Sequence, residues 1–164
     1  MEELDLINGQ NKVIGKAPRK EIEKKGLLYR CAGVYVLVGG KICVQKRASS
    51  KKIRPLHYSI VEETVKSGET FKQAAIRGVK EEIGLGAKNL KALGEITIKD
   101  QAYNDNFLFK IFSAEGTGKI SIDKNEVDSA KLLSFGGAKK LLASKEKTSP
   151  GFSKSFKMFE GSLE

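Results

Sequence analysis

The residues of this chain best suited to chemistry are acids and one arginine between positions 63 and 85. Glu81 and Glu82 are adjacent, and Arg77 follows Glu69 by eight residues. Carboxylate oxygens are the ligands that Mg²⁺ and Mn²⁺ prefer, and such a cation bridges readily to diphosphate oxygens. A bound cation offsets charge on phosphorus and lowers the pKa of an attacking water. Because carboxylates are unfavourable near a helix C-terminus, the acidic pair indicates metal binding rather than a merely solvated helix face.

The same segment resembles the Nudix box, whose pattern is G-x5-E-x7-R-E-U-x-E-E-x-G-U, where U is a bulky aliphatic residue. Seven of its nine positions match: Glu69, Arg77, Val79, Glu81, Glu82, Gly84 and Leu85. The resemblance implies that Glu81 and Glu82 bind the metal, and that Glu69 and Arg77 fix a loop against a helix through charge-assisted hydrogen bonds. It also implies a Nudix-like fold, in which a mixed β-sheet is sandwiched by helices.

Two positions depart from this pattern. Glu63 stands where the box opens with glycine, and Gly78 stands where a glutamate follows the arginine. In parts of the family that glutamate binds metal or acts as general base, and on a helix position 78 shares a face with positions 81 and 82. Glycine inside a helix costs about 1 kcal/mol relative to alanine, so position 78 needs space or backbone proximity. Glu62, Glu63 and Glu126 are the candidate replacements, and Glu126 is favoured as supplementary ligand or base.

Basic residues outnumber acidic ones by 30 to 20, which gives a formal net charge of +10. This balance favours anionic partners such as nucleotides, diphosphates or nucleic acid. Within the basic segment 41–54, Lys46, Arg47 and Arg54 are predicted to bind substrate phosphates, and a solvated loop is the alternative. His57 is the only histidine and is interpreted as a packing or surface residue.

Segments outside the box look like the isopentenyl-diphosphate-isomerase-like branch of the Nudix family, among them Asn11–Gly15 and Gln45–Arg47. Isomerase chemistry in that branch needs a catalytic cysteine and several metal-binding histidines. Here Glu23 and Tyr29 stand where the branch often has histidine, and no cysteine lies within Tyr58–Val65. The sequence therefore favours diphosphate hydrolysis over isomerisation.

Hydrophobic periodicity predicts an α+β fold, a mixed sheet layered with helices. The dipeptides Asn8-Gly9 and Gly39-Gly40 predict two hairpins, the first at about residues 4–15. An apolar residue recurs every four positions from Phe71 to Ile83, which predicts a helix over 69–83 ended by Gly84. Further strands are expected at 57–61, 90–99, 106–114, 120–122 and 127–134, and further helices at 19–25 and 136–144. Residues from about 145 to 164 are expected to form a tail whose phenylalanines cover the domain.

Length and composition are those of one globular domain spanning residues 1–164, with 40% hydrophobic and 30% charged residues. Cys31 and Cys43 lie in apolar runs and are expected to be reduced, buried thiols. The chain has no apolar run of membrane-spanning length and its N-terminus is acidic, so neither a membrane span nor a signal peptide is expected. These features together predict a cytoplasmic protein.

The sequence as a whole predicts a Mg²⁺- or Mn²⁺-dependent hydrolase of a diphosphate linked to another group, a nucleotide-type or related small molecule. Glu82 and either Glu126 or Glu63 are the expected catalytic carboxylates. The alternative is a catalytically silent Nudix domain that binds nucleotide or RNA through its basic segments. Gly78 supports that alternative, whereas the intact pair Glu81-Glu82 argues against it.

Overall fold

A computed structural model describes residues 2–163. The elements, in chain order, are β1 (Glu3–Ile7), β2 (Val13–Pro18), α1 (Arg19–Lys25), β3 (Leu28–Val38), β4 (Lys41–Arg47), β5 (Tyr58–Ser59), β6 (Val61–Thr64), α2 (Phe71–Ile83), β7 (Gly86–Asp100), the short 3-10 helix η1 (Gln101–Tyr103), β8 (Asp105–Thr117), β9 (Val127–Leu133), α3 (Phe135–Ala143) and α4 (Pro150–Leu163). The predicted α+β class is confirmed. None of the helices in the described part of the chain is long and apolar enough to cross a membrane.

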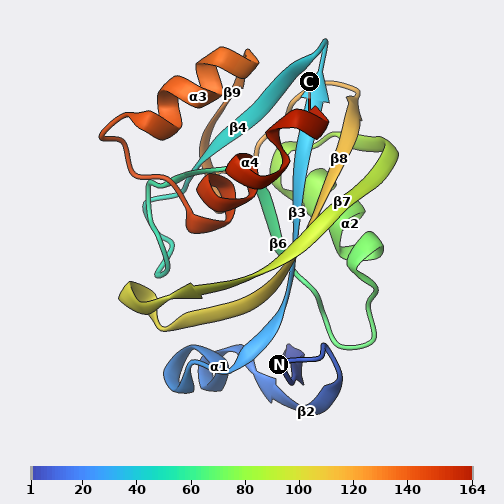
Figure 1. Cartoon of the computed structure of the whole chain (residues 1–164), viewed down its shortest axis with the longest axis vertical. Coiled ribbons are helices and arrows are strands. Elements are labelled where there is room, and N and C mark those ends of the chain that lie inside the picture. The colour runs from blue at the N-terminus through green and yellow to red at the C-terminus, as the bar shows by residue number, and fades with distance from the viewer. Residues whose placement is uncertain (1, 164) are drawn as a thin grey trace.

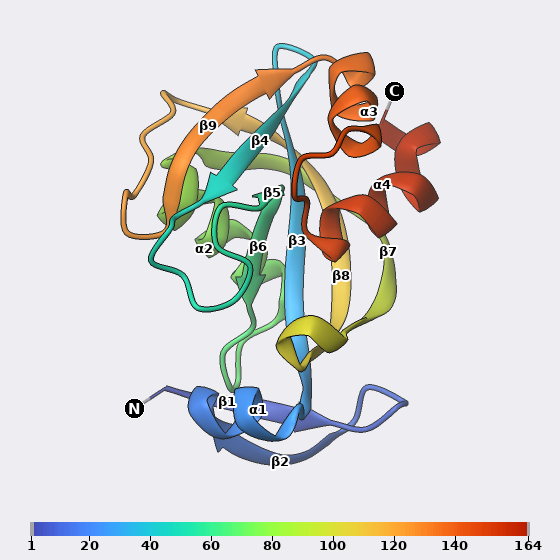
Figure 2. The ribbon, with the colours of Figure 1, turned by 90° about the vertical axis from the view of Figure 1, so that its left-hand side faces the viewer.

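A seven-stranded mixed sheet forms the centre of the molecule, with the strand order β5-β4-β3-β8-β7. Strand β6 also pairs with β3, and β9 also pairs with β4. β3 and β8 run parallel, and the other pairs in this sheet are antiparallel. Helix α2 covers one face of the sheet, whereas α3 and α4 lie on the other (Figures 1 and 2). The first hairpin, β1–β2, forms a separate two-stranded sheet beside α1 at one end of the molecule (Figure 2).

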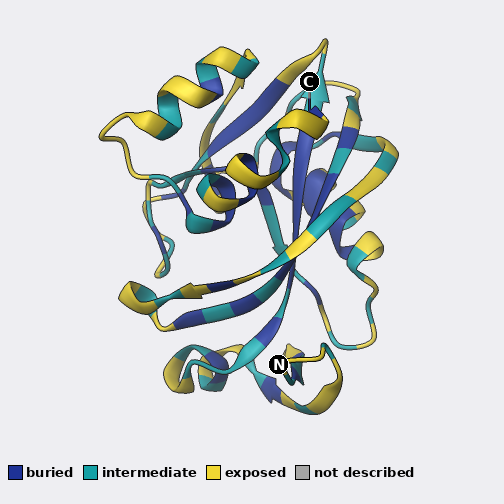
Figure 3. Cartoon of the chain, in the orientation of Figure 1, coloured by how far each residue is buried: buried dark blue, intermediate teal, exposed yellow. Residues whose placement is uncertain are grey.

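Each face of the sheet has its own hydrophobic core because successive strand residues point to opposite faces. On β3, Val34 packs in the core under α2, whereas Tyr35 packs in the core under α4. The central strands are buried and the outer sides of the helices are exposed (Figure 3). Cys31 and Cys43 are buried free thiols, as predicted.

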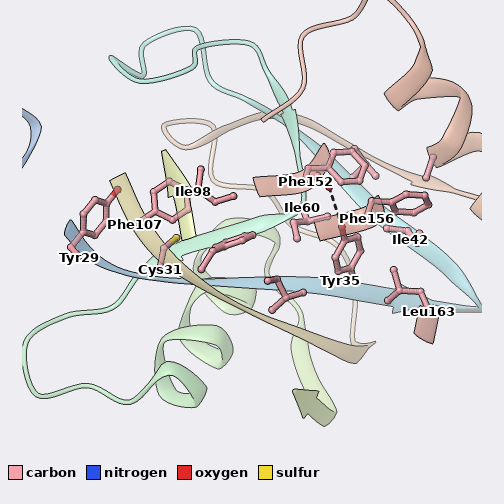
Figure 4. Packing of buried hydrophobic residues seen from close by; sticks show 14 of the residues in the cluster. Tyr29, Cys31, Tyr35, Ile42, Ile60, Ile98, Phe107, Phe152, Phe156 and Leu163 are labelled. Carbon is pink, nitrogen blue, oxygen red and sulfur yellow. Dashed lines mark hydrogen bonds between the residues drawn. The ribbon is translucent and has the colours of Figure 1, made fainter. Parts of the chain in front are cut away.

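The last twenty residues are not a tail, and this prediction is wrong. Residues Pro150–Leu163 form α4, which places Phe152 and Phe156 on one helical stripe because they are four residues apart. Both rings pack around Tyr35 (Figure 4), and the Tyr35 hydroxyl lies 2.6 Å from the Ser155 hydroxyl. The expectation that the phenylalanines cover the domain is met, but through a helix.

The strand expected at 120–122 is also absent from the described structure. The Ser121 amide donates to the carbonyl of Ile83 (2.9 Å), at the end of α2. Ile120 and Ile122 pack against the core under this helix. Residues 120–122 therefore pack against the C-terminal end of α2 and do not form a strand.

Helix α2 begins two residues later than predicted because Thr70 is its N-cap. The Thr70 side chain accepts from the Gln73 amide, and the Gln73 side chain accepts from the Thr70 amide, which completes a capping box. Gly84 ends the helix in the left-handed conformation, at φ 73°. Glu69 consequently lies in the loop before the helix, while the other acids of the motif lie on it.

We expect Phe152→Ala to lower the free energy of unfolding by about 3–5 kcal/mol, because the ring is fully buried and its removal leaves a cavity. Met158→Ala on the same helix is the matched control, because Met158 is 59% exposed. That change should stay within about 0.5 kcal/mol. Urea denaturation of both variants measures the difference, and equal effects would show that α4 is not an integral part of the core.

Candidate functional site

A cavity of about 590 Å³ brings together most of the residues that the sequence singles out. Its acidic residues come from the segment before β1, from α1, β6, α2 and β8, and from the loop before β9: Glu2, Glu23, Glu62, Glu63, Glu81, Glu82, Asp105, Asp123 and Glu126. Its basic residues are Arg19, Arg47, Lys51, Lys52, Arg54, Lys66 and Arg77. A cavity lined by both kinds of charge suits a phosphate compound bound through a cation and basic side chains together.

Arg77 connects α2 to the loop and strand that precede it. Its Nε and Nη2 donate to the two carboxylate oxygens of Glu69, each at 2.9 Å, and Nη2 also donates to the Thr64 carbonyl (2.8 Å). These hydrogen bonds lower the pKa of Glu69 below its ordinary value. The paired carboxylate and guanidinium therefore fix the start of α2 against the end of β6.

The same guanidinium holds two further carboxylates. Arg77 Nη1 lies 3.3 Å from Glu63 on β6 and 3.2 Å from Glu81 on α2. Glu81 is the more exposed of these two acids, with 54% of its side chain accessible against 18% for Glu63. One cation thus gathers acids from a strand, a loop and a helix that would otherwise repel one another.

Glu82 lies deeper than Glu81 and next to Glu63. Burial raises the pKa of Glu82, and the charge of Glu63 raises it further. Burial also raises the pKa of Glu63, although the charge of Arg77 opposes this shift. Two carboxyls with raised pKa values thus line the same cavity.

Gln45 is a site residue that the sequence analysis does not single out. Its Nε2 donates to Glu82 (2.5 Å), and its Oε1 has no hydrogen-bond partner among the described residues although it is buried. The alternation of side chains along a strand could have revealed it. Gln45 lies two residues after Cys43, whose side chain packs in the core under α2, so both side chains point to the same face. A polar residue at that position of β4 therefore faces the helix that carries Glu82.

Glu126 lines the same cavity, but its carboxylate binds a lysine of the loop after β4. Lys51 Nζ lies 2.5 Å from the Glu126 carboxylate, and the Ala48 amide donates to the Glu126 carbonyl. The loop after β4 and the loop before β9 are therefore joined at this point. Glu126 is separate from the group that Arg77 gathers.

The three basic residues predicted to bind phosphates have different surroundings. Arg54 is buried between Asp100 (3.0 Å) and Asp105 (2.9 Å), and Arg47 donates to the carbonyls of Ile53 and Arg54. Both line the cavity, but these contacts hold the loop after β4 in place. Lys46 does not line it and lies over the ring of Tyr58. The exposed lysine of this loop that does line the cavity is Lys52.

The residue before the C-terminal helix contacts an acid that lines the cavity. Glu62 accepts from the hydroxyl of Ser149, the residue before α4, at 2.5 Å. Burial raises the pKa of Glu62, although the nearby charge of Arg54 opposes this shift. Tyr29 donates to Asp105 (2.6 Å) at the same end of the cavity. The position of α4 thus affects the site directly, and the sequence pattern did not show this connection.

The contribution of Glu69 to stability should depend on pH. Because Arg77 lowers its folded-state pKa, the pair stabilises the fold above pH 4.5, the ordinary glutamate value, and this contribution is lost as pH falls below it. Glu69→Gln should therefore cost about 1–2 kcal/mol at pH 7 and progressively less towards pH 3. Glu95→Gln, at an exposed position without a salt bridge among the described residues, is the control. Urea titrations across this pH range that give a constant difference would contradict this assignment.

The NUDIX domain family model matches residues 28–154 of this chain. An uncharacterized Nudix hydrolase of Pseudomonas aeruginosa is 25% identical over 131 residues, which cover 77% of this chain and 75% of the relative. An uncharacterized Nudix hydrolase of Streptomyces coelicolor is 31% identical over 120 residues, 72% of this chain and 59% of the relative. These matches do not distinguish the isomerase-like branch that the sequence resembles.

Solved structures show the same fold. A Deinococcus radiodurans protein superposes with a TM-score of 0.79 at 18% identity, covering 96% of this chain and 98% of its own. An Ap4A hydrolase of C. elegans superposes with a TM-score of 0.59 at 18% identity, covering 82% of this chain and 98% of its own. At 18% sequence identity, these superpositions show that the fold is the same.

Proposed function

This chain belongs to the Nudix hydrolase family, and we propose that it is a divalent-metal-dependent hydrolase of a small molecule in which a diphosphate is linked to another group. Hydrolysis of nucleoside-diphosphate-linked compounds is the general activity of this family. The observation that carries the proposal is the acidic group around Arg77, which lines one cavity together with Glu82 and several lysines.

The donor set at this group fits Mg²⁺ or Mn²⁺. Glu63 and Glu82 both line the cavity, and Gln45, which donates to Glu82, has a buried Oε1 without a hydrogen-bond partner among the described residues. Two carboxylates and a neutral amide oxygen are ligands of the kind that these cations prefer. Across residues 2–163 no three acids, histidines or cysteines are already arranged as a metal cage, and Glu81 is paired with Arg77. We assign Glu81 and Glu82 as the residues that would hold the metal, with Glu63 beside them. When bound, the metal offsets charge on the phosphorus and lowers the pKa of an attacking water.

The surrounding residues position this acidic group and accept protons. Arg77 keeps α2 and β6 together, and Gln45 orients Glu82 through its amide. Two acids are candidates to take the proton of the attacking water: Glu63 next to Glu82, and Glu126, which Lys51 holds at the other loop. Lys52, exposed at the cavity, is placed to contact substrate phosphates.

The alternative of a silent domain that binds nucleotide or RNA through its basic segments receives less support. Arg54 is buried in two ion pairs and Arg47 donates to backbone carbonyls, so neither guanidinium is available on an open surface. A screen for metal-dependent phosphate release from nucleoside and prenyl diphosphates separates the two functions. Turnover that requires Mg²⁺ or Mn²⁺ supports the hydrolase, and binding without turnover across the screen supports the silent domain.

Replacing Glu82 should remove metal binding. We expect Glu82→Gln to weaken Mn²⁺ affinity by at least about tenfold, because even an outer-shell partner of a metal contributes that much. The change keeps the side-chain volume nearly the same, so the fold should persist. Calorimetry with Mn²⁺ on the wild type, Glu82→Gln, Glu81→Gln and the exposed control Glu95→Gln measures this. Unchanged affinity in both Glu81 and Glu82 variants would refute the metal assignment.

Removing a lysine at the cavity should affect substrate binding. We expect Lys52→Ala to raise the KM of the best substrate in the screen by roughly 3- to 10-fold and to reduce its salt dependence, because a phosphate contact is lost. Lys41→Ala is the matched control, since Lys41 is exposed but does not line the cavity. Equal KM values for the two variants at every salt concentration would return Lys52 to the role of a solvated surface residue.

A further inference from the structure

The side chain of Glu63 occupies the space into which a side chain at position 78 would project. A Cβ atom added to Gly78 would lie 2.7 Å from Glu63 Cβ, 3.1 Å from its Cγ and 3.4 Å from its Oε2. The first distance is far shorter than ordinary van der Waals contact, which for carbon atoms is about 3.5–4 Å. Even an alanine at 78 therefore meets the first carbon of the Glu63 side chain.

The backbones on both sides of this contact are held in place. β6 pairs with the central strand β3, with Glu63 opposite Ala32 and Glu62 opposite Gly33. α2 is capped at both ends, and Gly78 is buried within it. Arg77 on α2 also donates to the Thr64 carbonyl on β6 (2.8 Å), so the two elements cannot separate without breaking this hydrogen bond. The close approach of positions 63 and 78 is therefore a property of the fold.

Position 78 also lies on the helical face that carries Glu81 and Glu82, because residues three and four apart are neighbours on a helix. A carboxylate at 78 would thus point towards the group that Arg77 gathers. The Glu63 carboxylate is already there, 3.3 Å from Arg77 Nη1 and in the same cavity as Glu82. The acidic group therefore contains this carboxylate, but it comes from the strand.

We propose that Glu63 and Gly78 form one coupled exchange: β6 supplies the carboxylate that α2 would otherwise supply, and glycine at 78 makes room for it. This inference rests on the proposed function for its chemical meaning, since it makes Glu63 the partner of Glu82 at the metal. The two departures from the motif are then a single change. A change at either position alone should cost stability or Mn²⁺ affinity, whereas changing both positions together should preserve them.

The spatial part of the exchange is the claim that the Glu63 side chain fills the space beside position 78. Melting temperatures test it without any ligand. Gly78→Ala should lower Tm by on the order of 5 °C in the wild type, although alanine is the better helix former. In a Glu63→Gly background the same change should leave Tm unchanged or raise it. Glu63→Ala is the matched control, because it removes the carboxylate but keeps the Cβ, so Gly78→Ala should still lower Tm there. An equal change of Tm in all three backgrounds would overturn the exchange.

The chemical part is the claim that Glu63 supplies at the metal the carboxylate that position 78 would otherwise supply. Mn²⁺ calorimetry tests it. Glu63→Gly should weaken Mn²⁺ affinity by at least about tenfold. Adding Gly78→Glu to it should restore affinity to within about threefold of the wild type, whereas Gly78→Glu alone should lower Tm without tightening binding. A double variant that binds no better than Glu63→Gly would overturn this part.

The two proposals fail in different ways. A wild-type protein that binds no Mn²⁺ and releases no phosphate would overturn the proposed function and the chemical part of the exchange. The spatial part would still be decided by the melting temperatures. Normal Mn²⁺ binding together with an unrescued double variant would instead overturn the exchange alone.

Discussion

The Arg77 guanidinium is the interaction on which the rest of the site depends. It contacts Glu69 in the loop, Glu63 and the Thr64 carbonyl on β6, and Glu81 on its own helix. Without this cation, three acids would lie within a few ångströms of one another and would disperse or take up protons. Its planar fork binds Glu69 in a bidentate manner, and its further hydrogen bond to the Thr64 carbonyl joins α2 to the sheet.

The site also depends on the two layers of helices that enclose the sheet. α2 carries Glu81 and Glu82, and its apolar stripe is anchored in the core on one face. On the opposite face α4 fills the other core with Phe152 and Phe156, and the serine before it binds Glu62. Strand β6, which carries Glu62 and Glu63, is therefore held from both sides (Figure 2). The two cores fix the backbone of β6, so Glu62 and Glu63 stay partly buried although burial raises their pKa values.

Gly78 shows how a local preference is overridden by tertiary packing. Helix propensity alone disfavours glycine inside α2, and the remaining features of that helix, its capping box and its left-handed terminal glycine, follow local preferences closely. The exception lies beside Glu63, where the space between helix and strand is already filled. Because both ends of the helix follow local preferences, the glycine at position 78 points to a tertiary cause.

The sequence by itself determined the features that depend on short-range chemistry. The glycine-linked hairpins, the helix ended by Gly84 and the spacing of Glu69, Arg77, Glu81 and Glu82 follow from turn preferences and helical periodicity, which act within a few residues. Only the tertiary structure decided how distant segments meet. It placed Gln45 against Glu82, Lys51 against Glu126 and Ser149 against Glu62, and it turned Arg54 inward to two aspartates. These contacts join residues tens of positions apart, and their partners are set by strand register and helix packing, which no local pattern encodes.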